Sequence, residues 1–526
     1  MAAAIDVKGW CPGVLQPMQS GDGLIARVRP WCGAFTLNEA MGLADAAARF
    51  GNGHIDLTRR GNLQIRGLSG QTLPGLRIAL DKLDLLDRDP RTEAGRNIMV
   101  GPLAGLDPAE QIDVRPIAHM LVRLLASEAA LHDLPSKFGF LVDGGGTVSI
   151  AGERADISLR AVGSEMAVGL DTPTRTQWLG TVPSAAAART AVALASVFVG
   201  IAKDHQRLRD LPDEVFARLL LTPSPAGGGR SHVASLGGAR ILPSSETSAT
   251  VGPNTAQRSL ATLQRGDAPR EMTPFSSSKL RVGAHYRPQQ NCHPERSEGP
   301  LQPPPNPYAI ALPAGGGGPQ GRRGTRSLDT KIAREMNAES PSALWAPPPA
   351  GEGALQPSLG VLDLGSGKFA VAVAAPFGRV EASQLRSLVE LVRDGGAADI
   401  RLSPWRALYV EAGDDSAALS IVESARALGF VVDAGDPVLR IEACPGAPAC
   451  RSSSVDARGT ARQIASYAFQ GSIHVSGCAK GCARSAPADL VLVGEQGRYN
   501  VIRNGTTRDA AERTIGAEEV EALFDV

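Results

Sequence analysis

Four cysteines in the last third of the chain form two close pairs that could bind an iron-sulfur cluster. They are Cys444 and Cys450, a C-x5-C pair, and Cys478 and Cys482, a C-x3-C pair. Glycine stands beside both pairs, at Gly446, Gly477 and Gly481. A cubane cluster needs one thiolate for each iron, and tight turns leave backbone N–H groups free to bond its sulfurs. The pattern therefore predicts a [4Fe-4S] cluster and a redox function.

Zinc and disulfides are the other uses that these cysteines could have. Structural zinc knuckles place about two to four residues between their cysteines, so C-x3-C fits one and C-x5-C is wide for one. Disulfides need an oxidising compartment, and Met1–Trp10 lacks the apolar core of an export signal, so we expect reduced thiols. Three cysteines lie outside the quartet, of which Cys11 could approach a site and is otherwise a packing residue; the others are Cys32 and Cys292.

The composition excludes several classes of partner. The chain has 526 residues, with 54 Lys and Arg against 54 Asp and Glu and a sequence pI of about 7.1. Its length predicts roughly three or four domains, and its balanced charge predicts binding neither to nucleic acid nor to a membrane surface. Ala185–Ile201 is apolar, but it contains Arg189 and is mostly alanine, so we expect a buried helix and no membrane span. The expected location is the cytoplasm.

An internal repeat relates the two ends of the chain. At an offset of 345 residues, His54–Ile65 aligns without gaps with Asp399–Val410, and Leu37–Phe50 aligns with Ala382–Gly395. Each copy has the pattern of a strand, an amphipathic helix and a second strand in which apolar and polar residues alternate. The repeat predicts two βαβ-like units, and the fold class is α+β.

Cationic residues gather in segments that the repeat would bring together. The candidates for binding a substrate are Arg60, Arg96 and Lys137. Guanidinium groups bind carboxylates in a bidentate way and stay charged at any pH, so cations beside a redox centre indicate a polycarboxylate or oxyanion substrate. A solvated strand face is the other interpretation, and it suits Arg59 and Arg66 better than Arg60.

These motifs together resemble the nitrite and sulfite reductase family. The cysteine spacing is that of the family's [4Fe-4S] ligands. Leu57–Arg60 resembles its substrate-arginine strand, Arg96-Asn97 its second arginine motif and Leu134–Phe138 its lysine motif. The similarity spans residues 9–221 and 358–493. It implies two ferredoxin-like half repeats in a pseudo-twofold arrangement and two α+β lobes.

A segment unlike either copy separates the two halves. Pro223–Pro357 is rich in Gly and Pro without a period, which is the composition of a disordered insertion. The lobe before it contains strand-like stretches, among them Thr147–Ile150. The expected domains are 9–80 (half repeat 1), 90–222 (lobe 1), 223–357 (insertion), 358–430 (half repeat 2) and 436–526 (lobe 2, with the cysteines).

Two departures from the reductase pattern indicate a substrate larger than sulfite. Gly139 stands where the reductases have a second lysine, and Cys478–Cys482 encloses Ala-Lys-Gly where the family usually has Pro-Asn. Losing a cation weakens the binding of a small oxyanion and leaves room for a larger ligand. With Trp10–Gly13 and Pro17–Gly23, these departures make the chain similar to the branch of the family that oxygenates a tetrapyrrole in aerobic cobalamin biosynthesis.

The resemblance to that branch implies a specific reaction. Precorrin-3A and O2 would be the substrates, and electrons would come ultimately from an NADH-linked donor. The three cationic residues would bind acetate and propionate groups, and the four cysteines would hold the electron-relaying cluster. A mononuclear non-haem iron is also implied, for which two histidines and a carboxylate are typical ligands. His54 and His474 are the candidates, with core or surface roles as the alternative.

Two other functions remain open at this point. A sirohaem-dependent nitrite or sulfite reductase would use the same four cysteines. An electron carrier or scaffold with a cluster and no substrate would need the cysteines and none of the cations.

Overall fold

The first half repeat is a βαβ unit with an additional hairpin and helix, as the sequence pattern predicted. The computed structural model describes residues 10–202, 205–216, 358–467 and 469–524, which all belong to one compact unit. The elements of half repeat 1 are β1 (Met18–Ser20), β2 (Gly23–Val28), β3 (Ala34–Thr36), α1 (Leu37–Phe50), β4 (His54–Leu57), β5 (Leu63–Leu68) and α2 (Leu73–Lys82). The predicted insertion, Pro223–Pro357, lies outside the described residues.

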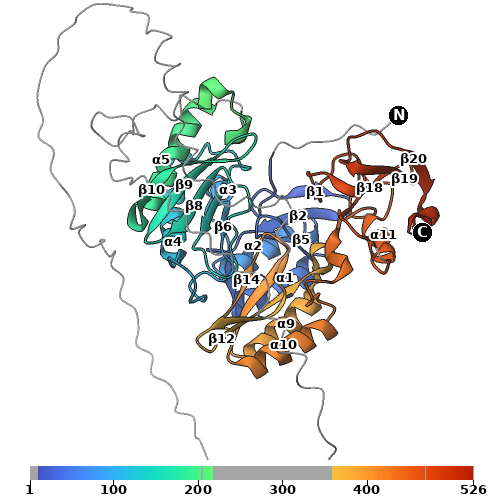
Figure 1. Cartoon of the computed structure of the whole chain (residues 1–526), viewed down its shortest axis with the longest axis horizontal. Coiled ribbons are helices and arrows are strands. Elements are labelled where there is room, and N and C mark those ends of the chain that lie inside the picture. The colour runs from blue at the N-terminus through green and yellow to red at the C-terminus, as the bar shows by residue number, and fades with distance from the viewer. Residues whose placement is uncertain (1–9, 203–204, 217–357, 468, 525–526) are drawn as a thin grey trace, which may run out of the picture. The chain divides into compact units, whose positions relative to one another are not determined.

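The second half repeat has the same elements in the same order (Figure 1). They are β11 (Gly360–Gly365), β12 (Lys368–Ala374), β13 (Arg379–Glu381), α9 (Ala382–Asp394), β14 (Asp399–Leu402), β15 (Ala407–Ala412) and α10 (Asp415–Ala427). The starts of α1 and α9, of β4 and β14 and of β3 and β13 all differ by 345 positions, which is the offset found in the sequence. The predicted internal repeat is confirmed.

The two half repeats exchange a strand, which the sequence did not predict. One sheet has the order β1-β2-β5-β4-β13 and the other β11-β12-β15-β14-β3, so each short strand completes the sheet of the other copy. The registers obey the same symmetry, since Thr36 opposes Asp399 and Glu381 opposes His54. Neither half repeat can therefore form its complete sheet alone.

Helices α1 and α9 pack against each other beneath these sheets and form the centre of the largest core. The first turn of α1 is fixed by a capping box, in which Thr36 and Glu39 satisfy each other's backbone N–H groups. Leu43 of α1 and its repeat counterpart, Leu388 of α9, are both fully buried in one cluster. This shared core joins the two halves into one body.

Lobe 1 is a five-stranded sheet covered by two helices. Its strands have the order β10-β9-β8-β7-β6, with β6, β7 and β8 parallel and the other pairs antiparallel. Its elements are α3 (Pro90–Gly95), β6 (Ile98–Val100), α4 (Arg115–Ser127), β7 (Phe140–Asp143), β8 (Ile157–Val162), β9 (Glu165–Asp171), β10 (Thr176–Pro183) and α5 (Ser184–Ala202). The predicted strand Thr147–Ile150 is wrong, because this segment is a loop.

Helix α5 contains the apolar stretch that was predicted to be a buried helix. Among the described residues it is the one helix long and apolar enough to cross a membrane by length and composition. Its Ala191, Ala195 and Phe198 are fully buried in the core of lobe 1, where Phe198 packs against Phe138. These contacts account for its apolar composition, and the prediction of a core helix is confirmed.

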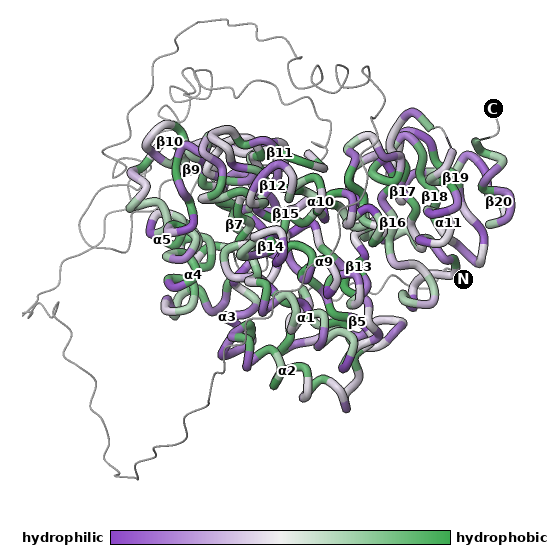
Figure 2. The backbone as a smooth tube through the Cα atoms, turned by 90° about the horizontal axis from the view of Figure 1, so that it is seen from below, coloured by the Kyte–Doolittle hydropathy of each residue, from purple (hydrophilic) through white to green (hydrophobic). Residues whose placement is uncertain are grey.

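Lobe 2 repeats the topology of lobe 1 with fewer helical residues. Its strands have the order β16-β17-β18-β19-β20, and β16, β17 and β18 are again parallel. Its elements are β16 (Ile441–Ala443), α11 (Ala457–Ile464), β17 (Ile473–Ser476), β18 (Ala488–Glu495), β19 (Arg498–Gly505) and β20 (Arg513–Gly516). Figure 2 shows an apolar stretch in β18, which agrees with the burial of both faces of this strand.

Candidate functional site

Two of the four cysteines follow neighbouring parallel strands of lobe 2. Cys444 comes directly after β16, and Cys478 comes just after β17. The carboxyl ends of parallel strands meet at one edge of a sheet, so both cysteine loops begin at the same place. The N–H of Cys444 donates to the carbonyl of Val475 over 3.2 Å, which holds the first loop against the end of β17.

The four thiols gather at this edge. None forms a disulfide, and Cys482 lies within electrostatic range of the other three, which are Cys444, Cys450 and Cys478. Burial raises the pKa of Cys444, while hydrogen bonds from the N–H groups of Gly477 and Gly446 act to lower it. The Gly477 N–H lies 3.1 Å from the Cys444 sulfur. Such N–H···S bonds are those that a cluster-binding thiolate accepts.

Four thiols are the number of ligands that a four-iron cluster needs, because a cubane distributes its thiolates over four irons. Among the described residues, no three His, Cys, Asp or Glu side chains form a group that could hold one metal ion.

The first cysteine loop is anchored on the hairpin of half repeat 1. The carbonyl of Ala449 accepts hydrogen bonds from the Gly21 N–H at 3.1 Å, the Ser20 hydroxyl at 2.7 Å and the Arg66 guanidinium at 3.0 Å. A Cβ atom on Gly21 would lie 2.4 Å from the Pro448 carbonyl oxygen, so only glycine permits this approach. The loop that carries Cys450 is thus positioned by residues 383 to 429 positions away in the sequence.

A buried carboxylate of β4 connects half repeat 1 to lobe 2. Asp56 of β4 binds three guanidinium groups, from Arg379 and Arg458 at 2.9 Å and from Arg66 at 3.3 Å. Burial alone would raise the pKa of Asp56, but the three arginines, with Arg458 the strongest, hold it well below its usual range. Arg66 is therefore a buried structural residue, and its interpretation as part of a solvated strand face is wrong.

Arg60 lies in the turn between β4 and β5, and Lys137 lies in the loop that precedes β7. Arg59 and Arg60 occupy the turn between β4 and β5, closed by Thr58 N–H to Asn62 carbonyl at 2.9 Å, and do not lie on the predicted strand. One Arg60 Nη donates to the Arg154 carbonyl at 2.9 Å, and burial together with Arg207 lowers the pKa of Arg60 to about 10. A Cβ on Gly139 would lie 3.6 Å from Arg60 Nη1, so these two predicted positions are neighbours.

The Lys137 loop is held by the side chain of Asn97. The Asn97 amide donates to the carbonyls of Ser136 at 2.6 Å and Phe138 at 3.2 Å, which flank the half-buried Lys137. The Ser136 hydroxyl accepts a hydrogen bond from the Cys11 N–H at 3.1 Å. Residues of the amino-terminal segment therefore contact the lysine loop at Cys11 and the cysteine loop at Ser20.

Arg96 has contacts that leave it little capacity to bind a ligand. Its guanidinium forms a bidentate pair with Asp87 at 2.7 and 3.1 Å and donates to the carbonyls of Arg29 and Pro30. It also lies 3.8 Å from the ring centre of Trp31. Four of its N–H groups are thus directed at protein acceptors in the core, which is a structural role.

The two histidines proposed for a mononuclear iron lie apart from any ligand set. His54 is partly exposed and lies 3.6 Å from Glu381. His474 is buried in β17, opposite Glu442 of β16, and burial lowers its pKa to about 4. The described residues therefore provide no group that fits a non-haem iron with two histidines and a carboxylate.

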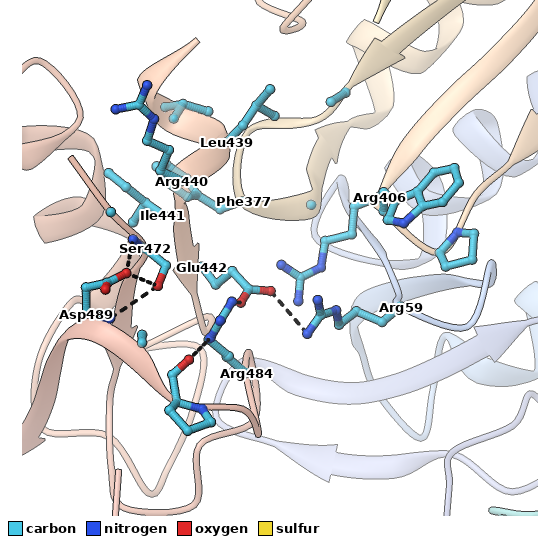
Figure 3. Close-up of a pocket in the computed structure, with 18 of the residues that line it drawn as sticks. Arg59, Phe377, Arg406, Leu439, Arg440, Ile441, Glu442, Ser472, Arg484 and Asp489 are labelled. Carbon is cyan, nitrogen blue, oxygen red and sulfur yellow. Dashed lines mark hydrogen bonds and ion pairs between the residues drawn. The ribbon is translucent and has the colours of Figure 1, made fainter. Parts of the chain in front are cut away.

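A cavity of about 700 Å³ opens between half repeat 2 and the start of the lobe 2 strands (Figure 3). None of Arg60, Arg96 and Lys137 lines it. Its charged residues are Arg59, Arg406, Arg440, Arg484, Glu442 and Asp489. Arg59 and Arg484 bind the two oxygens of Glu442 at 3.2 and 2.7 Å. Sequence reasoning interpreted Arg59 as part of a solvated strand face and missed the other five residues, although Arg484 lies two positions after Cys482.

Comparison with known proteins agrees with this fold. Residues 16–83 match the family model of the nitrite/sulfite reductase ferredoxin-like half domain. The solved structure of the Mycobacterium tuberculosis NirA protein has the same fold, with a TM-score of 0.57 and 18% identity over 95% of this chain and 79% of that one. The chain therefore carries the half domain and the fold of the nitrite and sulfite reductases, as the motifs predicted.

Relatives within this group differ in how much of the chain they match. A precorrin-3B synthase of Sinorhizobium sp is 29% identical over 503 residues, which cover 95% of this chain and 83% of that protein. A ferredoxin–nitrite reductase of Leptolyngbya laminosa is also 29% identical, but the match covers 28% of this chain and 30% of that protein. The similarity that extends along nearly the whole chain is thus to a precorrin-3B synthase.

Proposed function

We propose that this protein converts precorrin-3A to precorrin-3B in an oxygen-dependent step of aerobic cobalamin biosynthesis. One oxygen atom of O2 hydroxylates the macrocycle, with closure of a lactone from an acetate group, and the other leaves as water with two electrons from an NADH-linked donor. The observation that carries the proposal is the near full-length similarity to a precorrin-3B synthase, in a chain that keeps four gathered thiols.

The four cysteines are proposed to hold a [4Fe-4S] cluster, which supplies single electrons when bound. The chain contributes N–H groups to it, since Gly477 already bonds the Cys444 sulfur. The three hydrogen bonds to the Ala449 carbonyl keep the Cys450 loop in place. The reducing conditions that preserve free thiols agree with the expected cytoplasmic location.

Arg60 and Lys137 are proposed to bind carboxylates of the tetrapyrrole. Arg60 lies beside Gly139, where the absence of a side chain leaves space next to the guanidinium. Each charge-assisted hydrogen bond to a carboxylate shielded from water contributes about 1.5–3 kcal/mol. Arg96 is omitted from this set because its guanidinium is bound to Asp87. Its contribution is to fix the segment that leads into β6.

Labelled oxygen tests the reaction directly. Cluster-loaded protein is incubated with precorrin-3A, a reductant and ¹⁸O₂, and the product is weighed by mass spectrometry. Uptake of one labelled oxygen atom into the macrocycle supports the proposal, while an unlabelled or unchanged macrocycle contradicts it. Arg60→Gln should raise KM roughly tenfold to a hundredfold. The matched control is Lys368→Gln, an exposed cation on β12.

A sirohaem-dependent nitrite or sulfite reductase is the second candidate, favoured by the partial matches to nitrite reductases. It would use the same four cysteines. The visible spectrum of anaerobically purified protein separates the two, because bound sirohaem gives an intense Soret band and a long-wavelength chlorin band. A cluster alone gives a broad shoulder.

A further inference from the structure

The cavity in Figure 3 lies at the repeat counterpart of the Arg60–Lys137 site. In lobe 1 the Gly139 N–H donates to Asp156 Oδ2 at 2.9 Å, and the Gly139 carbonyl accepts from the Ile157 N–H at 3.2 Å. In lobe 2 the Ser472 N–H donates to Asp489 Oδ2 at 2.7 Å, and the Ser472 carbonyl accepts from the Leu490 N–H at 3.1 Å. The matching bonds make Ser472 the equivalent of Gly139.

Further equivalences follow from the same alignment. The segment that precedes Ser472 corresponds to the Lys137 loop and begins at Gln470, a residue of the cavity wall. At the repeat offset of 345, Trp405 corresponds to Arg60 and also lines the cavity. The two predicted cations of the first site are thus replaced by an aromatic ring and an amide in the second.

Positive charge is nevertheless kept in the second site by other residues. Each oxygen of Glu442 is bound by one arginine, Arg59 on one side and Arg484 on the other. Arg406 points into the same space in Figure 3, close to Arg59 and Glu442. Among the described residues, the guanidinium of Arg406 donates one hydrogen bond, to the Ala483 carbonyl at 3.3 Å, which leaves most of its five N–H groups for a ligand.

Charge balance and burial both indicate an anionic ligand. Four guanidinium groups and two carboxylates line the cavity, which leaves an excess of positive charge. Glu153, a carboxylate of lobe 1, interacts with Arg59 and offsets part of that excess. The side chains of Arg484 and Glu442 are only 17% and 14% exposed, so the charges are partly shielded from water. Burial lowers the pKa of Arg406, with Arg59 acting in the same direction and Glu442 opposing both. A bound anion would relieve this cost of confining cations together.

The opposite wall of the cavity is apolar. Its apolar residues are Phe377, Val438, Leu439 and Ile441, and Arg440 lies among them. A volume of about 700 Å³ is within the range of sites that enclose organic ligands, and a few charged groups on a largely apolar wall fix a ligand's orientation. The ligand class is therefore a large organic anion with at least two carboxylates and an apolar body.

We propose that this cavity is a second carboxylate-binding site, in which Arg406, Arg59 and Arg484 bind the acid groups of such a ligand. Its existence is independent of the proposed function. The identification of its natural ligand as a carboxylated tetrapyrrole rests on that function. The site adjoins the second cysteine pair, because Arg406 bonds the carbonyl of Ala483, the residue after Cys482.

Binding of coproporphyrin III, a tetracarboxylate, by the full-length protein with its cluster tests the proposal by isothermal titration calorimetry. Arg406→Gln should weaken binding at one site about tenfold, and Arg406→Gln with Arg484→Gln should abolish that site. Arg406→Lys, which keeps the charge, should retain more affinity than Arg406→Gln. The matched control Arg498→Gln changes an exposed arginine of β19 and should bind as the wild type does.

Two results would overturn the second site. One is unchanged coproporphyrin affinity in the Arg406 and Arg484 variants while Arg60→Gln removes binding, which would assign the ligand to the first site alone. The other is equal affinity for the uncharged tetramethyl ester, which would exclude carboxylate recognition. Coproporphyrin binding that depends on Arg406, without incorporation of labelled oxygen, would support the second site and contradict the proposed function. Incorporation of labelled oxygen, without binding that depends on Arg406, would support the proposed function and contradict the second site.

Discussion

Lobe 1 and lobe 2 have the same strand order, and they differ in the loops that follow their first two strands. After β6 comes Gly101, whose N–H donates to the Val142 carbonyl over 3.2 Å. After β16 comes Cys444, whose N–H donates to the Val475 carbonyl over the same 3.2 Å. The backbone has one geometry at both places, but only lobe 2 has a thiol there.

In the lobe 1 loops, carboxylates accept the hydrogen bonds of nearby N–H and hydroxyl groups. Asp143, at the end of β7, accepts hydrogen bonds from the Ser149 hydroxyl at 2.7 Å and the Ile150 N–H at 3.2 Å. Its counterpart in lobe 2 is Ser476, whose hydroxyl donates to the Cys478 carbonyl. In both lobes the sheet therefore places the starts of two loops at one edge. A few side chains decide whether these loops form hydrogen bonds within themselves, as in lobe 1, or present thiols to a ligand, as in lobe 2.

The half repeats show a second contrast at the 345-residue offset. Asp56 of β4 corresponds to Arg401 of β14, and both are buried charges. Asp56 binds Arg458 of lobe 2, whereas Arg401 binds Asp399 and donates to the Ala104 carbonyl of lobe 1 at 2.6 Å. Half repeat 1 therefore contacts lobe 2 through a negative side chain, Asp56, and half repeat 2 contacts lobe 1 through a positive one, Arg401.

The largest expected effect comes from removing a thiol of lobe 2. Cys478→Ser should reduce bound iron from about four atoms per chain to near zero, because a hydroxyl is a poor ligand for the cluster. The measurement is iron and acid-labile sulfide per chain after anaerobic purification. Cys32→Ala, which removes a thiol outside the quartet, should leave both values unchanged. Full iron retention in Cys478→Ser would remove the functional difference between the lobes.

The cysteine motif and the repeat were readable in the sequence because both are local patterns. Spacing identified Cys444 and Cys482, and a fixed offset identified α1 and α9. The exchange of strands β3 and β13 could not be predicted from the sequence, because each strand has three residues and its partner lies in the other copy. Arg96 was misjudged for a related reason: its carboxylate, Asp87, lies outside the motif that drew attention to the arginine.

Asp56→Ala should cause the next largest effect, because it leaves the buried Arg379 and Arg458 without a carboxylate and Arg66 with Asp22 alone. Removing one partner of a buried ion pair costs about 3–5 kcal/mol in free energy of unfolding. The comparison variant Asp399→Ala removes the carboxylate partner of Arg401, which keeps its bond to the Ala104 carbonyl, so we expect about 1.5–3 kcal/mol. Urea unfolding followed by circular dichroism measures both. Equal losses would show that the two junctions are equivalent.

The pKa of Asp56 also gives the sign of its pH dependence. Its pKa is lower in the folded protein than in the unfolded chain, so its stabilisation is complete above the ordinary Asp pKa of 3.8 and is lost as pH falls below it. Asp56→Asn should therefore reduce the acid sensitivity of unfolding between pH 5 and pH 3. A variant as acid-sensitive as the wild type would contradict the assigned ion pairs.

Gly21→Ala should have a moderate effect confined to the cluster. The added methyl group would meet the Pro448 carbonyl at 2.4 Å and the Cys450 N at 2.9 Å, so the Cys450 loop must move. We expect iron loss to a chelator to become several times faster, measured by the decay of visible absorption, with little change in circular dichroism. Gly70→Ala is the matched control, because a Cβ there has no neighbour within 4 Å. Equal rates in both variants would mean that the hairpin does not position the loop.

The smallest effect is expected in lobe 1, where a carboxylate takes part in closing the loop after β6. Glu110 accepts a hydrogen bond from the Gly105 N–H at 2.6 Å, and burial, assisted by Asp113, raises its pKa to about 7. An acid with a raised pKa binds its proton more tightly in the folded state, so its contribution to stability falls as pH rises from about 4.5 to 7 and is constant above that.

Glu110→Gln keeps a neutral side chain at every pH, so it should lose this pH dependence. The thermal midpoint of the wild type, compared with that of Glu110→Gln, should fall by a small amount between pH 5 and pH 8. Glu165→Gln, in a partly exposed residue of β9, serves as the control and should follow the wild type. A parallel pH profile for wild type and Glu110→Gln would show that the lobe 1 loop closes without help from a protonated carboxyl. The two lobes would then differ only in whether their loops carry thiols, and the carboxylates of lobe 1 would have no role beyond ordinary loop hydrogen bonding.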